Sequence, residues 1–357
     1  MSEVFLLGSG FSKAVSRQMP VTKELSREIL ARYKSANDLP PEIRRMIEED
    51  VEKALTFLAA EKPWLAETEN LRHKVISLEL THVIRYLFLE KSRDALVWGI
   101  NKPPAWLDSL LAYWHNNRCA VITLNYDTLI ERVASTTYDA KRPKIPTDQL
   151  YPIRLTPATS QNPAHQTRAI EIEEPIKTFK LFKLHGSINW FYSGRSDFFG
   201  EELFYVPCNG GVDGVFDMTD GHDADNVDWC RLGGKCPLII PPMLDKSVFF
   251  EHEALRSMWF QASQATRTAD RVICFGYSLP KSDLAMSQFL NSCAPPNRVC
   301  FEIVNLERRD QHFAETIGSE LYEFRQELSE DKCVPMFVIS NLIENRDEKA
   351  RLLRQLH

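Results

Sequence analysis

Three polar, turn-prone clusters, each at the end of a short apolar run, constrain the fold of this chain more than any other feature. They are residues 8–12 (Gly-Ser-Gly-Phe-Ser), 123–127 (Thr-Leu-Asn-Tyr-Asp) and 184–187 (Leu-His-Gly-Ser), and they close the apolar runs 4–7, 119–122 and 179–184. Short apolar runs of this kind are typical of strands buried on both faces of a parallel sheet. Ligands of such α/β proteins bind outside the carboxyl ends of the strands. The sequence therefore predicts an α/β fold with a nucleotide site at one edge of its sheet.

The pattern of apolar residues divides the rest of the chain. Through residues 22–116 they recur every three or four positions, which indicates a helical insertion after the first strand. Residues 136–270 include two stretches without a clear period and are expected to form a small irregular module with substrate-side loops. Residues 271–357 are expected to supply the second half of the core, ending in a strand at 335–340 and a helix at 341–357.

Length and charge limit the classes of function. Residues 1–357 are expected to form one large domain with these additions. The net charge of -6 is spread along the chain without a long run of Lys or Arg, so direct nucleic-acid binding is not expected. No apolar run approaches the roughly 20 residues of a membrane helix. The chain opens without the pattern of a secretory signal and its cysteines are scattered, so we expect a cytoplasmic protein with reduced thiols.

The first cluster is a candidate phosphate loop. Gly8 and Gly10 let the backbone turn sharply into a helix whose free N–H groups would face a phosphate. Ser12 adds a hydroxyl that can reach the same group. The alternative is that the glycines only permit tight packing, and Lys13 stands where a dinucleotide fingerprint has a third Gly or Ala.

The second and third clusters carry the candidate catalytic residues. Asn125 can hold a ribose hydroxyl or a water, and Asp127 can accept from a carboxamide, whereas the alternative is an Asx turn that caps the next helix. His185 follows an apolar run and precedes a glycine that opens space beside it. Because histidine suits proton transfer near neutral pH, a catalytic role is favoured over that of a core or surface histidine.

Two further groups have weaker patterns. Asn305 and Glu307 close a late strand, where a carboxylate can accept from ribose hydroxyls. The alternative is an exposed helix N-terminus, where the helix dipole favours Glu. Zinc could be bound by three cysteines and a histidine, but their spacings match no common site, so no metal is expected. These zinc candidates are Cys208, His222, Cys230 and Cys236.

Together the motifs resemble the sirtuin superfamily of NAD-consuming proteins, over about residues 4–307. The five matching segments, in the order of the family, are the glycine loop 8–12, the N-x-D segment 125–127, the histidine motif 185–186, the Gly-Tyr-Ser turn 276–278 and the N-x-E segment 304–307. The resemblance implies a sirtuin-type, Rossmann-like parallel sheet with NAD as the substrate. It also implies the NAD-binding residues Gly8, Ser9, Gly10, Phe11, Ser12, Gly276, Ser278, Asn305 and Glu307.

The departures from the family favour one branch of it. Residues 19–25 lack the P-D-F-R segment of protein-deacylating sirtuins, Leu124 replaces a Gln, and paired C-x-x-C motifs are missing. Residues 239–247 do not match the loop that pairs with a substrate peptide, which disfavours β-augmentation of an acetylated peptide. The chain instead resembles the sirtuin-like domains of prokaryotic antiviral defence systems, and the implied activity is cleavage of NAD to nicotinamide and ADP-ribose.

This resemblance also implies roles and partners. Asn125 would position the nicotinamide ribose or the attacking water, His185 would act as base or orienter, and Asp127 would contact the carboxamide. An ungated NADase would kill its host, so we expect control by homo-oligomerisation or by a partner such as a HerA-type ATPase or an Argonaute-like protein. An NAD-dependent protein deacylase and a non-catalytic module that senses NAD or ADP-ribose remain as alternatives.

Overall fold

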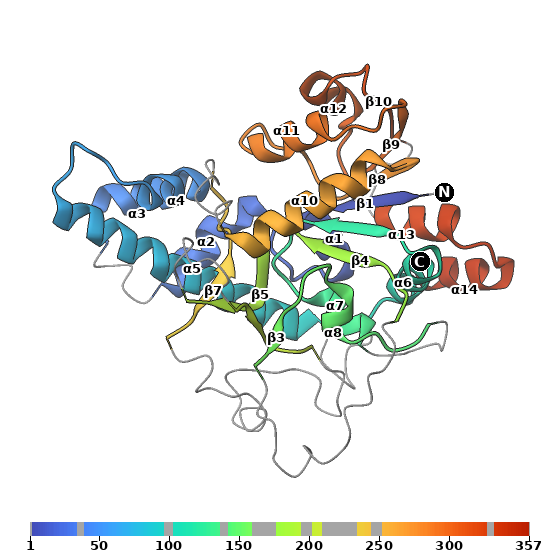
Figure 1. Ribbon diagram of the computed structural model, residues 1–357, viewed down its shortest axis with the longest axis horizontal. Helices are drawn as coiled ribbons and strands as arrows, with labels where there is room; N and C mark the ends of the chain where they lie inside the picture. The colour runs from blue at the N-terminus through green and yellow to red at the C-terminus, as the bar shows by residue number, and fades with distance from the viewer. Residues whose placement is uncertain are drawn as a thin grey trace, which may run out of the picture.

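The core of the protein is a six-stranded sheet in which every strand pair is parallel (Figure 1). The computed structural model describes residues 2–33, 39–95, 103–135, 142–158, 176–193, 202–208, 234–243, 252–326 and 332–356. In sheet order the strands are β10 (Tyr322–Arg325), β9 (Val299–Val304), β8 (Arg271–Phe275), β1 (Glu3–Leu7), β2 (Ala120–Thr123) and β4 (Lys180–Lys183). The predicted Rossmann-like α/β fold is therefore confirmed.

The strand order reverses between β1 and β8. The chain runs from β1 through β2 to β4 on one side, and from β8 through β9 to β10 on the other. Leu7 pairs with both Thr123 and Phe275, so the carboxyl ends of β1, β2 and β8 lie level. Such a reversal opens a crevice outside the strand ends, which is where α/β proteins bind ligands.

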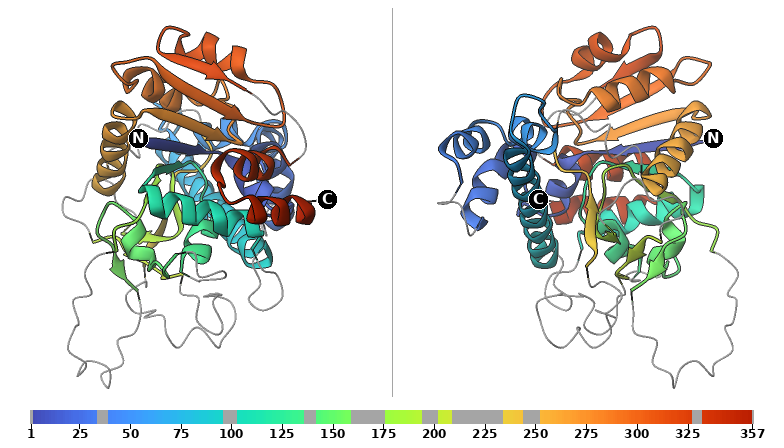
Figure 2. Two further views of the ribbon diagram at one scale, coloured as in Figure 1. Left: turned by 90° about the vertical axis from the view of Figure 1, so that its right-hand side faces the viewer. Right: turned by 60° about the vertical axis from the view of Figure 1, so that its left-hand side comes forward.

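Helices cover both faces of this sheet (Figure 2). One face is covered by α10 (Glu253–Arg267), which packs on β2 and β4. The other face carries α1 (Ser9–Val15), α6 (Ala105–Asn117), α13 (Cys333–Phe337), the π-helix η5 (Val338–Leu342) and α14 (Arg346–Leu356). The outer half of the sheet also carries α11 (Leu284–Ser292) and α12 (Asp310–Ile317).

The prediction of a final strand at residues 335–340 is wrong. These residues lie in α13 and η5, and the last strand of the sheet is β10 instead. A short apolar run reads equally well as a buried helix or a buried strand, because both bury every side chain. Pro335 fits the helix because it lies in the first turn, where its missing N–H is not required.

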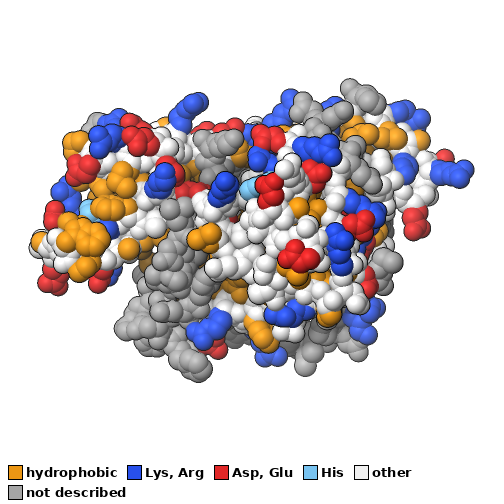
Figure 3. Space-filling model, turned by 90° about the horizontal axis from the view of Figure 1, so that it is seen from above, with side chains coloured by type: hydrophobic (Ala, Val, Ile, Leu, Met, Phe, Trp, Pro, Cys, Tyr) orange, Lys and Arg blue, Asp and Glu red, His pale blue; other side chains and the backbone are white. Residues whose placement is uncertain are grey.

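Four helices between α1 and α6 form a lobe at one end of the molecule. They are α2 (Thr22–Arg32), α3 (Pro41–Glu49), α4 (Val51–Ala59) and the 29-residue α5 (Glu67–Ala95). Their apolar faces, which include Ile47, Leu55 and Leu80, are buried against one another. On the face seen in Figure 3, acidic and basic side chains are interspersed, and hydrophobic ones gather on this lobe, where Trp64 and Leu71 are exposed.

A second sheet of four strands lies beside the parallel one, in the order β3 (Thr156–Pro157), β6 (Phe204–Tyr205), β5 (Gly186–Tyr192) and β7 (Cys236–Ile239). The small helices α7 (Leu129–Ala134) and α8 (Thr147–Leu150) accompany it. The described part of residues 136–270 is thus more regular than the sequence indicated, because strands of two residues leave no periodic signal. Among the described residues, no helix is long and apolar enough to span a membrane.

Candidate functional site

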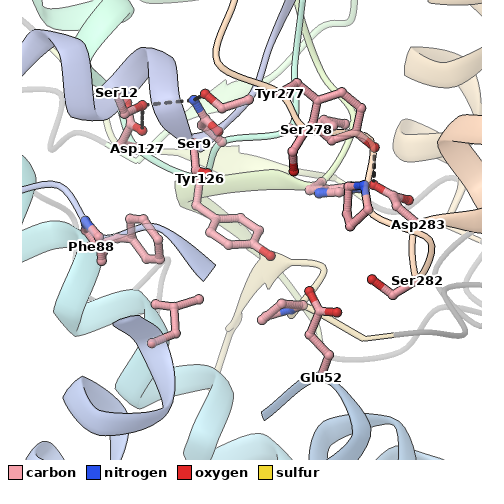
Figure 4. Close-up of a pocket in the computed structure, with 18 of the residues that line it drawn as sticks. Ser9, Ser12, Glu52, Phe88, Tyr126, Asp127, Tyr277, Ser278, Ser282 and Asp283 are labelled. Carbon is pink, nitrogen blue, oxygen red and sulfur yellow. Dashed lines mark hydrogen bonds between the residues drawn. The ribbon is translucent and has the colours of Figure 1, made fainter. Parts of the chain in front are cut away.

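An open pocket of about 820 Å³ lies at the carboxyl edge of the parallel sheet, where the strand order reverses. The turns after β1, β2, β4 and β8 meet around it, and the inserted helices close one side (Figure 4). The described residues that line it are Gly8, Ser9, Ser12, Pro20, Leu25, Glu52, Phe88, Leu124, Asn125, Tyr126, Asp127, His185, Pro242, Met243, Tyr277, Ser278, Pro280, Ser282 and Asp283.

The glycine loop is in direct backbone contact with the turn after β8. The Gly8 N–H donates to Phe275 O, and the Gly10 N–H donates to Gly276 O, both at 2.9 Å. A Cβ at Gly8 would lie 2.6 Å from the Cα of Tyr277, and one at Gly10 would lie 2.8 Å from the Cα of Gly276. The structure therefore accounts for both glycines by tight packing, the alternative raised from the sequence.

Gly8 and the two serines of this loop line the pocket. Ser9 and Ser12 line it, whereas Gly10 and Phe11 do not. Phe11 is buried in the core, and its ring stacks on Phe275 with centroids 6.2 Å apart. The Ser9 hydroxyl and the backbone around Gly8 are thus what this loop presents to a ligand, because the Ser12 hydroxyl donates its proton to Asp127.

Asn125 is fixed by its own amide group. Its Nδ2 donates to Gly8 O and to Ser12 Oγ, both at 2.9 Å, and its backbone N–H donates to Thr123 Oγ1 at 3.1 Å. Because both amide protons are used in this way, the group left for a ligand is the carbonyl Oδ1, an acceptor. An acceptor at this position can hold a ribose hydroxyl or a water.

Asp127 lies one step further along the same chain of hydrogen bonds. Its carboxylate accepts from Ser12 Oγ at 2.6 Å and from the Leu129 backbone N–H at 3.2 Å, so it forms the Asx turn that caps α7. Burial raises the pKa of this carboxyl, against the opposing effects of Lys183 and of the Ser12 hydrogen bond. Asp127 still lines the pocket, but its oxygens hold Ser12 and a helix end in place.

A buried ion pair beneath Asp127 was not foreseen from the sequence. Lys183 Nζ lies 3.0 Å from Glu131 Oε1, with each side chain 1% exposed, and it also donates to the backbone oxygen of Asp127. The Tyr151 hydroxyl donates to the same Glu131 oxygen at 2.7 Å. The sequence carries a signal for this pair, because a lysine at the end of a buried strand requires a carboxylate partner.

His185 lies at the junction between the two sheets. It is buried and lines the pocket, and its backbone oxygen accepts from the Ile240 N–H at 2.8 Å. The Tyr126 ring lies 6.3 Å from the imidazole, and its hydroxyl donates to Ile240 O at 2.7 Å. Gly186 has φ +75°, and a Cβ there would lie 2.1 Å from Leu238 O, so the backbone beside the histidine is tightly determined.

Two acidic residues of the pocket were not identified from the sequence. Figure 4 shows Glu52, from α4, and Asp283, from the N-terminus of α11, on the side of the pocket away from Ser12 and Asp127. Asp283 accepts from the Tyr277 hydroxyl at 2.8 Å and from the Met286 N–H at 3.5 Å. No motif marks either residue, since each looks like an ordinary acidic residue at a helix N-terminus.

The two residues proposed for the adenosine ribose lie outside this pocket lining. Asn305 Nδ2 donates to Tyr277 O at 3.1 Å, so it supports the turn after β8 from behind. The Glu307 carboxylate pairs with Arg309 and its side chain is 63% exposed. Gly276 likewise is not a lining residue, but its φ of +60° shapes the turn that presents Ser278.

The zinc candidates are only partly described. Cys230 and His222 lie outside the described residues. Burial raises the pKa of the Cys208 thiol to about 11. Within the described residues, no group of three or more His, Cys, Asp or Glu side chains is arranged to hold a metal ion.

Comparison with known proteins gives matches among solved structures alone. No protein-family model and no curated protein matches the chain. One similar structure, from work on sirtuin substrate affinity, is 13% identical over 99% of this chain and 93% of its own, with a TM-score of 0.40. Another is Sir2 in complex with the inhibitor EX-527, 2′-O-acetyl-ADP-ribose and a deacetylated p53 peptide, 14% identical over 99% and 93% of the two chains, with a TM-score of 0.36. Both of these solved structures are of sirtuins, and their sequence identity to this chain is low.

Proposed function

We propose that this protein binds NAD and hydrolyses it to nicotinamide and ADP-ribose. The observation that carries the proposal is the meeting of Asn125 and His185 with the glycine loop around one pocket at the switch point of the sheet. These residues belong to three turns far apart in the sequence. They are also the segments whose sequence resembles the NAD-cleaving branch of the sirtuin superfamily.

For this reaction the protein mainly has to orient the NAD and the water and to stabilise the charge that develops at the ribose. The bond between the ribose C1′ and the nicotinamide nitrogen breaks, nicotinamide leaves with the bonding electrons, and water adds to C1′ with loss of a proton. On this proposal, Asn125 Oδ1 accepts a hydrogen bond from the ribose hydroxyl or the attacking water, and His185 orients the water or takes its proton. On this proposal, Ser9, Ser12 and Ser278, which line the pocket, lie beside the pyrophosphate.

The biological role follows from the same resemblance. A cytoplasmic NADase that acts without restraint depletes the NAD of its own cell, so its activity needs a gate. We propose that it is the effector of an antiviral defence system in which NAD loss stops the infected cell. We propose that the activity is controlled by assembly, either of several copies of this chain or with a HerA-type ATPase or an Argonaute-like protein.

The direct test is release of nicotinamide from NAD by the purified chain, alone and with each candidate partner. Asn125→Ala and His185→Ala should each abolish release while leaving the circular dichroism spectrum unchanged. Asn117→Ala and His115→Ala are matched controls in α6, away from the pocket lining, and should keep full activity.

Other outcomes would replace the proposal. Release at the wild-type rate by both site variants would remove the assignment of Asn125 and His185. O-acetyl-ADP-ribose formed from an acetylated peptide would instead identify a protein deacylase. NAD bound tightly under every condition without release of nicotinamide would identify a sensing module.

A further inference from the structure

We infer that Glu52 is a specificity-determining residue, whose carboxylate recognises the positive charge of the nicotinamide ring and so favours NAD⁺ over NADH. The inference rests on the proposed function, because it takes NAD as the ligand of the pocket. Glu52 comes from the helical insertion, whereas Asn125, His185 and the glycine loop come from the edges of the sheets.

The backbone of Glu52 is held firmly at the start of α4. Asp50 caps this helix, and its Oδ1 accepts from the N–H groups of Glu52 at 3.0 Å and Lys53 at 3.1 Å. The Thr56 hydroxyl donates to Glu52 O at 2.7 Å. Val51, beside it, is buried in the core of the lobe. The carboxylate is therefore presented to the pocket from a fixed helix end, as Figure 4 shows.

The other two carboxylates of the pocket are already bonded within the protein. Asp127 accepts from Ser12 and Leu129, and Asp283 accepts from Tyr277 and a helix N–H. For the Glu52 carboxylate, no donor is found among the described residues, so it can take a ligand group without breaking an existing bond.

Among the described residues that line it, the pocket also has no cation to neutralise Glu52. None of the described lining residues is a lysine or an arginine. Burial raises the pKa values of Tyr126 and Tyr277, and the negative charge of Glu52 adds to the rise for both, so its field extends over both aromatic walls. An uncompensated negative charge among low-polarity walls favours a ligand that brings a positive one.

NAD⁺ brings that charge at one place only, the nicotinamide ring. NADH has the same pyrophosphate, riboses and adenine, but its dihydronicotinamide is neutral. The two forms therefore differ at the group that Glu52 would recognise. The carboxylate would lower the affinity for the neutral form relative to the cationic one by on the order of fivefold, the effect of a partly screened ion pair.

The test compares the dissociation constants of an uncleavable carbocyclic NAD⁺ analogue and of NADH by calorimetry, using the full chain. Glu52→Gln keeps the shape of the side chain and removes its charge. It should weaken the binding of the cationic analogue about fivefold and leave that of NADH unchanged. Glu49→Gln, at the exposed end of α3, is the matched control and should change neither constant.

Nicotinamide release from NAD, measured on the same preparations, separates this inference from the proposed function. Equal effects of Glu52→Gln on both ligands, or no effect, would overturn the role of Glu52 even if the wild-type chain releases nicotinamide. If Glu52→Gln weakens only the binding of the cationic analogue and the wild type releases no nicotinamide, the role of Glu52 is supported and the proposed hydrolysis is overturned. If the wild type binds neither ligand, the role of Glu52 and the proposed function are both overturned.

Discussion

The hydroxyl of Ser12 donates to the carboxylate of Asp127 across 2.6 Å, although 115 residues separate them in the sequence. The same hydroxyl accepts from Asn125 Nδ2 at 2.9 Å, so one buried oxygen joins the turn after β1 to the turn after β2. Its orientation is defined, because it can donate only one proton and gives it to Asp127. The position of Asn125 in the pocket thus depends on a residue that reaches it from another strand.

Ser12→Ala should weaken both stability and activity. It leaves the buried Asp127 carboxylate without one of its donors, which costs about 1–3 kcal/mol of unfolding free energy, and it removes an acceptor of Asn125. Urea denaturation and nicotinamide release measure the two effects. Ser16→Ala, one turn further along the chain, is the control and should change either quantity little. Wild-type stability in Ser12→Ala would show that this link contributes nothing.

Gly276→Ala should be among the most destabilising substitutions in the chain. The residue has φ +60°, and an added Cβ would lie 2.4 Å from the backbone carbon of Gly10. Gly234→Ala separates the two causes, because Gly234 has φ +71° but nothing lies within 4 Å of its added Cβ. We expect a loss of about 1–2 kcal/mol at Gly234, the strain of a left-handed residue, and a clearly larger loss at Gly276. Equal melting temperatures of the two variants would contradict the close contact of the turns.

Lys183→Met should cost about 3–5 kcal/mol, because it leaves the Glu131 carboxylate buried without a cation. Combining it with Glu131→Gln should recover part of this loss, since the second change removes the uncompensated charge. Lys53→Met is the surface counterpart, where Lys53 lies 3.5 Å from Asp50 with 68% of its side chain exposed, and it should cost less than about 1 kcal/mol. Chemical denaturation of the four proteins gives the comparison. A Lys183→Met variant as stable as Lys53→Met would be incompatible with the buried pair.

Asp127 should make stability depend on pH in an unusual direction for an aspartate. Its pKa in the folded protein is raised above 3.8, the ordinary value for an aspartate, chiefly by burial. The folded state therefore binds the proton more tightly, and the contribution of this group is complete below pH 3.8 and is lost as the pH rises through its folded pKa.

Asp127→Asn cannot ionise, so its stability relative to the wild type should rise with pH across that window. Urea denaturation from acidic to neutral pH measures the difference between the two proteins. The exposed Asp347→Asn variant corrects for other titrating groups. A difference that falls with increasing pH would mean that Lys183 and Ser12 outweigh burial.

The parallel sheet could be predicted because both of its faces are covered. Residues 4–7 and 271–275 are apolar almost throughout for that reason, and each ends at a glycine-containing turn. The meeting of the turns at one edge then follows from parallel topology. These strong local signals predict that Ser12, Asn125 and His185 lie close together at one edge of the sheet.

The rest could not be predicted, because it depends on contacts between distant segments. Nothing in the pattern of residues 51–59 distinguishes Glu52 from other acidic residues in the first turn of a helix. The two-residue strands β3 and β6 exist only because of their partners, since β6 pairs with β5 and β3 pairs with β6. Asn305 has the side chain expected of a ligand-binding residue, but the direction of that side chain, toward Tyr277 O, is set by the turn in front of it.

Gly8, Gly10 and Gly276 pack main chain against main chain between β1 and β8, and of the three only Gly8 lines the pocket, where it forms the floor. Substitutions in a floor of this kind cannot change the ligand preference, because any residue larger than glycine there would push the two strands apart. The choice of ligand must then be made by the walls, and one wall is contributed by a helical segment that is not part of the sheet. Within this architecture, new ligand preferences could arise by altering the inserted helices while this floor stays the same.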